Sequence, residues 1–238
     1  MTAQTLAEAY ADAAHRLAGR TDVLGNSVAL LQDAAALMGG AAAGLLVRRP
    51  DGALELVACT SHRAAELELY ERQERRGPCA EAIRTGRVVS AGAGDLGRRW
   101  GGVGQAVLDA GFRRVDAFPV FWHDDVLGAL NLFHGEGGPL EPEAERTGAT
   151  FATMAALLLA RPSDLSTGTV QQQVLAALES RVVIEQAKGV LAYLWRVDMA
   201  QAYALLVQAA ADQGRPLTEV ASRIVEDASR RDREGRDR

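Results

Sequence analysis

The chain has 238 residues and a formal net charge of −5, with 48% hydrophobic and 24% charged residues. This is an ordinary globular mixture in a chain long enough for more than one domain. The acidic balance excludes a protein that adheres broadly to nucleic acid by charge, so any nucleic-acid contact must come from a local patch.

The sequence contains no uninterrupted apolar run of about 18 residues, and no basic region leads into an apolar run near Met1. We therefore expect a cytoplasmic protein without a membrane span or a signal peptide. The two cysteines, Cys59 and Cys79, lack C-x-x-C spacing and a nearby histidine cluster. Neither a disulfide framework nor a metal site is predicted.

The N-terminal region alternates between helical and β-favouring segments. Alanine and leucine at helical spacing predict two opening helices, and apolar runs around a Pro-Asp-Gly turn predict a β-hairpin after them. Two helices, further strands and a closing alanine-rich helix follow. In chain order, the expected segments are residues 6–17 and 23–38 (helices), 43–48 and 54–60 (strands), 64–76 and 79–85 (helices), 88–90, 115–121 and 126–134 (strands), and 143–160 (helix).

Three motifs lie in this region: G-P-C-A-E-A-I-R-T-G-R-V-V at residues 77–89, D-A-F-P-V at 116–120 and L-G-A-L-N-L-F at 127–133. Their order and the order of the elements resemble the GAF domain. The resemblance implies an α+β domain over residues 1–161, with an antiparallel sheet and flanking helices, that senses a signal or dimerises. Some GAF domains enclose a nucleotide, a tetrapyrrole or another small ligand. The sequence identifies neither a cofactor nor ligand-binding residues, and it leaves open an unknown small-molecule ligand.

Several residues of this region have two interpretations. Cys79 is either an activated thiol or a buried small residue, and burial is favoured because only nearby arginines could activate it. His123 and His134 flank the last hairpin and could touch a ligand or haem, although histidines at strand ends are usually just surface groups. Trp100 and Trp122 suit a flat ligand but also suit packing.

A helix is expected over residues 169–196, after a linker at residues 162–169. Apolar residues at Val170, Val174 and Ala177 follow the 4 and 3 spacing of a coiled-coil seam. This spacing predicts a parallel homodimer through residues 170–178. A seam that packs only on its own domain is the alternative.

The segment R-V-V-I-E-Q-A-K-G-V-L at residues 181–191 places two surfaces on one helix. At about 100° per residue, one side is an apolar stripe that predicts core positions. The stripe contains Val183, Ile184, Ala187, Val190, Leu191, Leu194 and Trp195. The other side includes Gly189, and glycine inside a helix costs about 1 kcal/mol relative to alanine. Either a nucleic acid or a neighbouring helix is expected to come close to that backbone.

Two further segments complete a pattern with this one: D-M-A-Q-A-Y-A-L-L-V-Q-A-A at residues 198–210 and L-T-E-V-A-S-R-I-V-E at residues 217–226. Together they resemble the ANTAR domain over residues 170–228. That domain is an all-α, three-helix RNA-binding module of bacterial antitermination regulators. The resemblance implies that the target is a pair of small stem-loops whose capture prevents a terminator hairpin from forming.

The candidate RNA-binding residues have side chains that could stack on bases, bond base edges or contact phosphate, or they leave room for RNA. Lys188 is assigned a phosphate contact. The resemblance supports Gln186, Lys188 and Gly189 most, because they lie in the motif itself. The full set is Arg181, Gln186, Lys188, Gly189, Tyr193, Arg196, Ser222 and Arg223.

Parts of the sequence are also compatible with two other functions. The second and third helices around Gly214 also resemble a DNA-binding helix-turn-helix, but Glu219, Glu226 and Asp227 would oppose DNA against the single Arg223. A GAF domain can also be a ligand-binding enzyme, such as the free methionine sulfoxide reductases. No catalytic cysteine cluster, P-loop or other catalytic motif is found, so an enzyme is not expected. Residues 229–238 alternate in charge and are expected to form a disordered tail.

Overall fold

The computed structural model describes residues 5–18, 23–160 and 167–236. It describes the side chains of all these residues except 18, 167–180 and 231–236. The chain divides into two compact units, Met1–Val174 and Leu175–Arg238. The predicted linker at residues 162–169 lies largely outside the described residues. The side chains of the predicted seam, residues 170–178, lie outside the described side chains.

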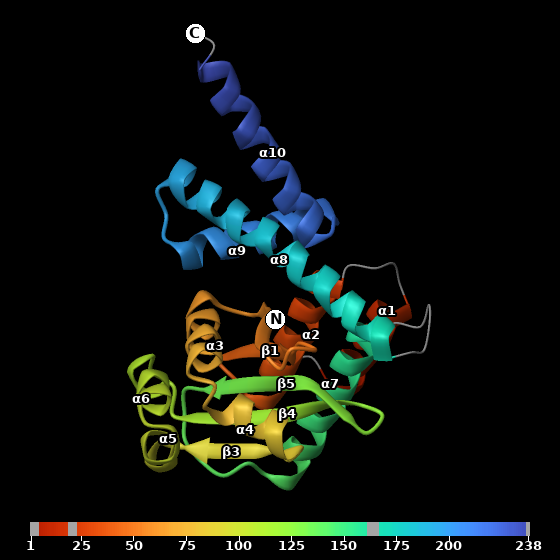
Figure 1. The fold of residues 1–238 in the computed structure, drawn as a ribbon, viewed down its shortest axis with the longest axis vertical. Helices are drawn as coiled ribbons and strands as arrows, with labels where there is room; N and C mark the ends of the chain where they lie inside the picture. Colours follow the sequence, from red (N-terminus) through yellow and green to blue (C-terminus); the bar gives the residue numbers. More distant parts are fainter. Residues whose placement is uncertain (1–4, 19–22, 161–166, 237–238) are drawn as a thin grey trace. The chain divides into compact units, whose positions relative to one another are not determined.

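The N-terminal unit is built on a five-stranded antiparallel sheet with strand order β2-β1-β5-β4-β3 (Figure 1). The predicted hairpin at the Pro-Asp-Gly turn is confirmed, and Gly52 has the positive φ of +79° that favours glycine there. The strands are β1 (Ala42–Arg48), β2 (Leu54–Cys59), β3 (Val89–Gly92), β4 (Arg114–Trp122) and β5 (Asp125–His134).

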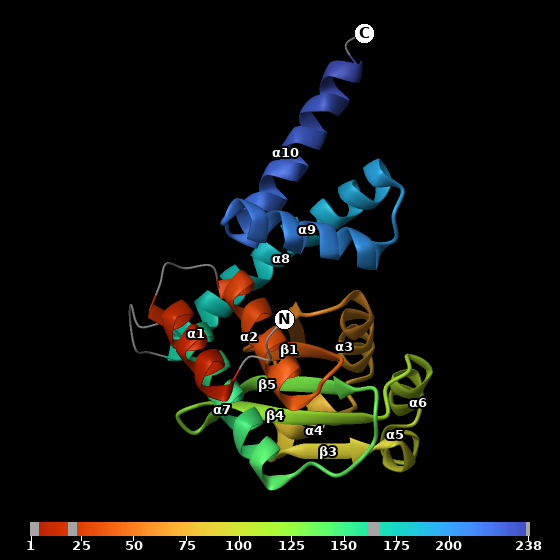
Figure 2. The same ribbon diagram turned by 180° about the vertical axis from the view of Figure 1, so that it is seen from behind.

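Helices cover both faces of this sheet (Figure 2). On one face, α2 packs on β1 and β2, α7 packs on β4 and β5, and α1 contacts α2 and α7. On the other face, α3 packs on β1 and β2, while α4 packs on the remaining three strands. The bounds are α1 (Leu6–Ala18), α2 (Val23–Met38), α3 (His62–Glu74), α4 (Pro78–Thr85) and α7 (Pro142–Leu159).

Between β3 and β4, where the sequence pattern predicts no element, the structure has α5 (Ala93–Trp100) and α6 (Gly102–Asp109). Their glycines lower helix propensity, which hid them from a pattern search. Close packing of the two helices requires one of those glycines. A Cβ on Gly104 would lie 1.9 Å from the carbonyl oxygen of Leu96.

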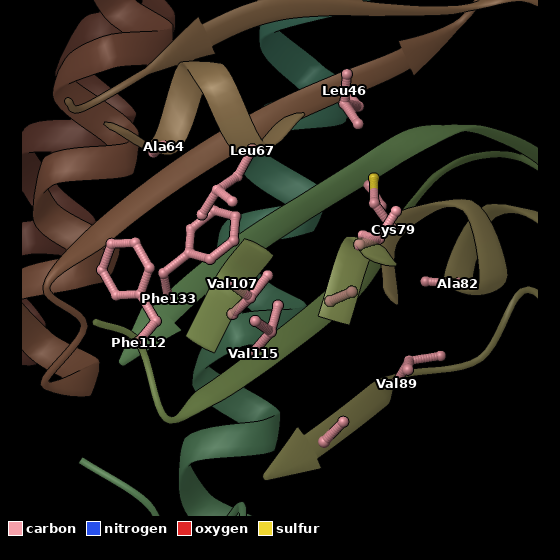
Figure 3. Packing of buried hydrophobic residues seen from close by; sticks show 14 of the residues in the cluster. Leu46, Ala64, Leu67, Cys79, Ala82, Val89, Val107, Phe112, Val115 and Phe133 are labelled. Atoms are coloured by element: carbon pink, nitrogen blue, oxygen red, sulfur yellow. The ribbon is translucent and has the colours of Figure 1, made fainter. Parts of the chain in front are cut away.

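Alternation along the strands separates two layers of core. Val115 and Ala117 of β4 point into the cluster beneath α3 and α4 (Figure 3). Phe118 points the other way, and a Cβ on Gly148 of α7 would lie 2.3 Å from its ring. The tight contact between α7 and the sheet therefore depends on the absence of a side chain at Gly148.

The C-terminal unit contains three helices, α8 (Thr167–Trp195), α9 (Met199–Gln213) and α10 (Leu217–Arg236). A capping box begins α9: Asp198 accepts a hydrogen bond from Gln201 N at 2.8 Å, and the Gln201 side chain accepts one from Asp198 N at 3.2 Å. Gly214, at φ +57°, ends α9 as predicted.

Helix α10 continues to Arg236, into the segment from residue 229 for which the sequence predicts a disordered tail. The same alternation of charge that suggested disorder places opposite charges three and four residues apart. Such pairs stabilise an exposed helix by about 0.2–0.5 kcal/mol each. Arg230, for example, lies 3.8 Å from Asp227.

Candidate nucleic-acid interface

The predicted core stripe of α8 is confirmed in its middle and wrong at its end. Ile184 and Ala187 are buried. Leu194 and Trp195 were predicted to be core residues, yet they are 51% and 67% exposed. The 3.6-residue period extends an apolar stripe to the end of a helix, but burial also requires partner helices that reach that far. The last turn of α8 therefore presents uncovered apolar side chains.

Lys188 was predicted to contact phosphate from the exposed side of α8, and this placement is wrong. Its side chain is only 3% exposed. The ammonium donates hydrogen bonds to both carboxylate oxygens of Glu185, at 2.9 and 3.1 Å. It also lies 5.5 Å from the centre of the Tyr203 ring on α9. The long aliphatic stem of lysine can occupy a core position while its ammonium lies at the edge of the core. Lys188 thus joins α8 to α9.

The opposite face of α8 carries Val182, Gln186, Gly189 and Tyr193, which lie within an arc of about 60°. All four are exposed, and Tyr193 is 84% exposed. Apart from the adjacent backbone of α8 itself, no described heavy atom lies within 4 Å of the position that a Cβ on Gly189 would take. Packing within the described residues therefore does not require this glycine, which leaves a surface open for close approach by another molecule.

Arg196 directly follows the last residue of α8 and has a backbone conformation that arginine rarely adopts. Its φ is +54°, and the bond from Val197 N to Ala192 O, at 3.2 Å, closes a Schellman-type end to α8. The end of α9 uses the same bond pattern, from Arg215 N to Ala210 O, with a glycine at the equivalent place. A side chain in this region costs on the order of 1 kcal/mol. The exposed guanidinium is held there despite that strain.

The remaining predicted residues occupy other positions. Arg181 has a side chain only 16% exposed and lies 3.8 Å from Glu185. Ser222 and Arg223 are on α10, where Ser222 is partly buried and Arg223 is exposed. Of the predicted residues, Gln186, Gly189 and Tyr193 therefore lie together on one face of α8. Ser222 and Arg223 lie on α10, and Lys188 is buried.

In the N-terminal unit, the structure reveals a buried acidic cluster that the sequence analysis missed. Glu68 accepts a hydrogen bond from Asn131 Nδ2 at 2.7 Å, and Glu71 accepts one from Ala80 N at 2.7 Å. All are buried or partly buried. Gly44 makes room for Glu68, since a Cβ there would lie 2.3 Å from its Oε1. A glycine in β1 opposite a glutamate was the available signal, but sequence alone does not show that the two meet.

Cys79, interpreted from the sequence as either an activated thiol or a buried small residue, lies fully buried at the start of α4 (Figure 3). Burial raises the pKa of the Cys79 thiol well above its ordinary value, and the neighbouring Glu71 and Glu68 raise it further. A thiol kept protonated in this way is a poor nucleophile. The interpretation of Cys79 as a buried structural residue is supported.

Two of the other candidate ligand residues of this unit, Trp100 and His134, have internal partners. Trp100 is buried and its indole N–H donates to Glu81 at 3.1 Å, so it packs rather than lines an open site. His134, considered a surface group, is buried instead. Its Nε2 lies 2.9 Å from Asp116, whose other oxygen accepts a hydrogen bond from Ser90 at 2.6 Å. Within the described residues, no group of three or more histidine, cysteine or acidic side chains could hold a metal ion.

The pKa of Glu71 is raised well above 4.5 by burial and by the adjacent Glu68. Folding therefore stabilises the protonated form, and this contribution, complete below pH 4.5, is lost as the pH rises through the pKa of the folded state. We expect Glu71→Gln to be more stable than the natural protein at pH 8 and to have a flatter pH dependence. Urea unfolding of the full chain from pH 5 to pH 8 measures this. Glu74→Gln, at an exposed position on the same helix, is the control; equal losses at both pH values for Glu71→Gln would contradict the expectation.

Residues 27–160 match the GAF domain family and residues 172–225 match the ANTAR domain family. The chain belongs to the GAF domain family and carries a C-terminal ANTAR domain. A GAF domain is a sensory module and an ANTAR domain is an RNA-binding antitermination module, so both parts are regulatory. The predicted order of an α+β domain followed by an all-α domain is confirmed. Among curated proteins, none matches the sequence significantly.

Solved GAF structures resemble the N-terminal unit at low identity. The GAF domain of a phosphoenolpyruvate-protein phosphotransferase from Coxiella burnetii is 12% identical, with a TM-score of 0.54 over 67% of this chain and 95% of that one. The equivalent domain from Acinetobacter is 10% identical, with a TM-score of 0.53 over 65% and 92%. A free methionine-R-sulfoxide reductase from Neisseria meningitidis is 14% identical, with a TM-score of 0.50 over 72% and 91%. These likenesses establish the fold alone.

No single helix in the described parts of the chain is long and apolar enough to cross a membrane. The segments Arg181–Trp195 and Met199–Gln213 would satisfy that test only as a pair, and they are bent by 108° relative to each other.

Proposed function

We propose that this chain is a homodimeric transcription antitermination regulator whose ANTAR domain captures paired stem-loops in nascent RNA. Its GAF domain senses a signal or dimerises, and any ligand is an unknown small molecule. Capture of nascent RNA would place the protein in the cytoplasm. The observation that carries the proposal is the exposed face of α8, where Gln186 and Tyr193 flank the open backbone of Gly189.

The chemistry of that face suits single-stranded loops. Splayed RNA bases stack on aromatic or guanidinium planes and form hydrogen bonds through their exposed edges. Tyr193 offers a ring, Gln186 an amide, and Arg196 a guanidinium at the end of the same helix. Arg223 on α10 adds a further exposed cation, whereas Lys188 is retained as a residue that positions α9. The exposed acids Glu226 and Asp227 on α10 disfavour DNA as a partner.

A binding titration of the full chain against a tandem-hairpin RNA, run beside a sizing experiment, tests the proposal. We expect one tandem RNA to bind two chains, because two loops match two ANTAR domains, and a single hairpin to bind more weakly. Light scattering without RNA shows whether the dimer exists beforehand. Equal binding to duplex DNA, absence of an RNA complex, or a monomer at micromolar concentration with and without RNA would refute the proposal.

A further inference from the structure

The last turn of α8 carries an exposed tryptophan for which packing offers no explanation. Trp100 is 6% exposed and bonded to Glu81, whereas Trp195 is 67% exposed. Trp195 lies on the core-facing side of α8, about 20° around the helix axis from the buried Ile184, and is nevertheless exposed. A large aromatic side chain in water exposes much apolar area, and rings of this kind are favoured where another molecule binds.

Trp195 and Tyr193 face different directions. At about 100° per residue they are separated by about 160° around the helix axis. The two rings therefore cannot contact opposite faces of one flat group, and any molecule that touches both must bend around the end of α8. A flexible single strand can do this, while a rigid duplex cannot.

Charge at this end of the helix favours an anionic partner. Arg196 is exposed, and within the described residues its guanidinium forms no ion pair or hydrogen bond. The nearest acid along the chain, Asp198, already accepts the capping bond from Gln201 N at 2.8 Å. In the sequence, a cation without an ion pair directly follows two exposed aromatic residues, Tyr193 and Trp195. This combination of side chains suits phosphate and stacked bases.

We propose that Trp195 stacks on an unpaired base of the RNA, as a second stacking surface separate from the face that carries Gly189 and Tyr193. The loop then wraps around the C-terminal end of α8, with a phosphate beside Arg196. This inference rests on the proposed function, and it adds a contact that the core-stripe interpretation had excluded. The base is recognised by its π face, so stacking at Trp195 adds affinity rather than sequence specificity.

The test compares Trp195→Ala, Trp195→Phe and Leu194→Ala in the full chain, titrated with the tandem-hairpin RNA. Trp195→Ala should weaken binding between about fivefold and 150-fold, whereas Trp195→Phe, which keeps a ring, should lose much less. Leu194→Ala removes an exposed apolar neighbour and should leave binding unchanged. RNA should quench the tryptophan fluorescence of the natural protein, and Trp195→Phe should remove most of that quenching.

Arg196→Gly is a second, independent variant. It relieves the left-handed backbone strain, as Gly214 does at the end of α9, so it should stabilise the domain while weakening RNA binding. Failure of the natural protein to bind the RNA would overturn the proposed function and this inference with it. Normal RNA binding by Trp195→Ala with unchanged quenching in Trp195→Phe would overturn the inference alone. A loss of self-association in both Trp195→Ala and Leu194→Ala, without RNA, would assign this surface to a protein partner and also overturn it.

Discussion

Lys188→Ala is expected to destabilise the ANTAR domain by about 2–4 kcal/mol, a magnitude typical of truncating a long buried side chain. The change removes the buried aliphatic stem, the two hydrogen bonds to Glu185 and the contact over the Tyr203 ring. Native-state hydrogen exchange of the full chain measures the loss, because the amides of α8 and α9 report on this unit separately from the GAF domain.

Lys188→Met is the matched variant, since it keeps most of the stem and removes the charge. The side chain of Glu185 is 43% exposed, so its carboxylate remains solvated, and replacing a buried ion pair by an apolar side chain of similar volume is often nearly neutral. We expect this variant to stay folded and to bind RNA with an unchanged salt dependence. A folded Lys188→Met with a salt slope lower by about one would show instead that the ammonium contacts phosphate in the complex.

The contrast at Lys188 shows what a helical pattern can and cannot predict. Residue spacing placed Ile184 and Ala187 in the core, and both are buried. Lys188 lies beside them on the helix, but hydropathy assigns every lysine to the surface. Its burial depends on Glu185 lying one turn away and on a ring that α9 brings close, and that second contact exists only after folding. Trp195 shows the opposite error: its apolar side chain and its core spacing predict burial, but the side chain is exposed.

The GAF domain shows the same division between local and long-range information. Turns with strong local signals, such as Pro50-Asp51-Gly52 before β2, were predicted correctly because few backbone conformations suit them. The pairing of Asn131 with Glu68 joins residues 63 positions apart. His134 and Asp116 meet across adjacent strands. Such buried polar contacts follow from strand register and helix placement, which one sequence does not specify.

Gly189→Leu is expected to abolish RNA binding while stabilising the ANTAR domain. Leucine is favoured over glycine inside a helix by roughly 0.8 kcal/mol, and the Cβ that it adds meets no described atom within 4 Å apart from the adjacent backbone of its own helix. The same side chain would project from the open face between Gln186 and Tyr193 and keep RNA from the backbone. Stability and affinity should therefore move in opposite directions, as measured by hydrogen exchange and by the tandem-hairpin titration.

Two variants isolate the cause of that effect. Gly189→Ala should give most of the gain in helix stability with a smaller loss of affinity, because its methyl group extends less far. Gly214→Ala should destabilise the domain instead, since φ is +57° there and an alanine would be strained. If Gly189→Leu unfolds the domain or dissociates a dimer, then Gly189 packs against a second copy of the chain. RNA would in that case have to bind elsewhere on the ANTAR domain.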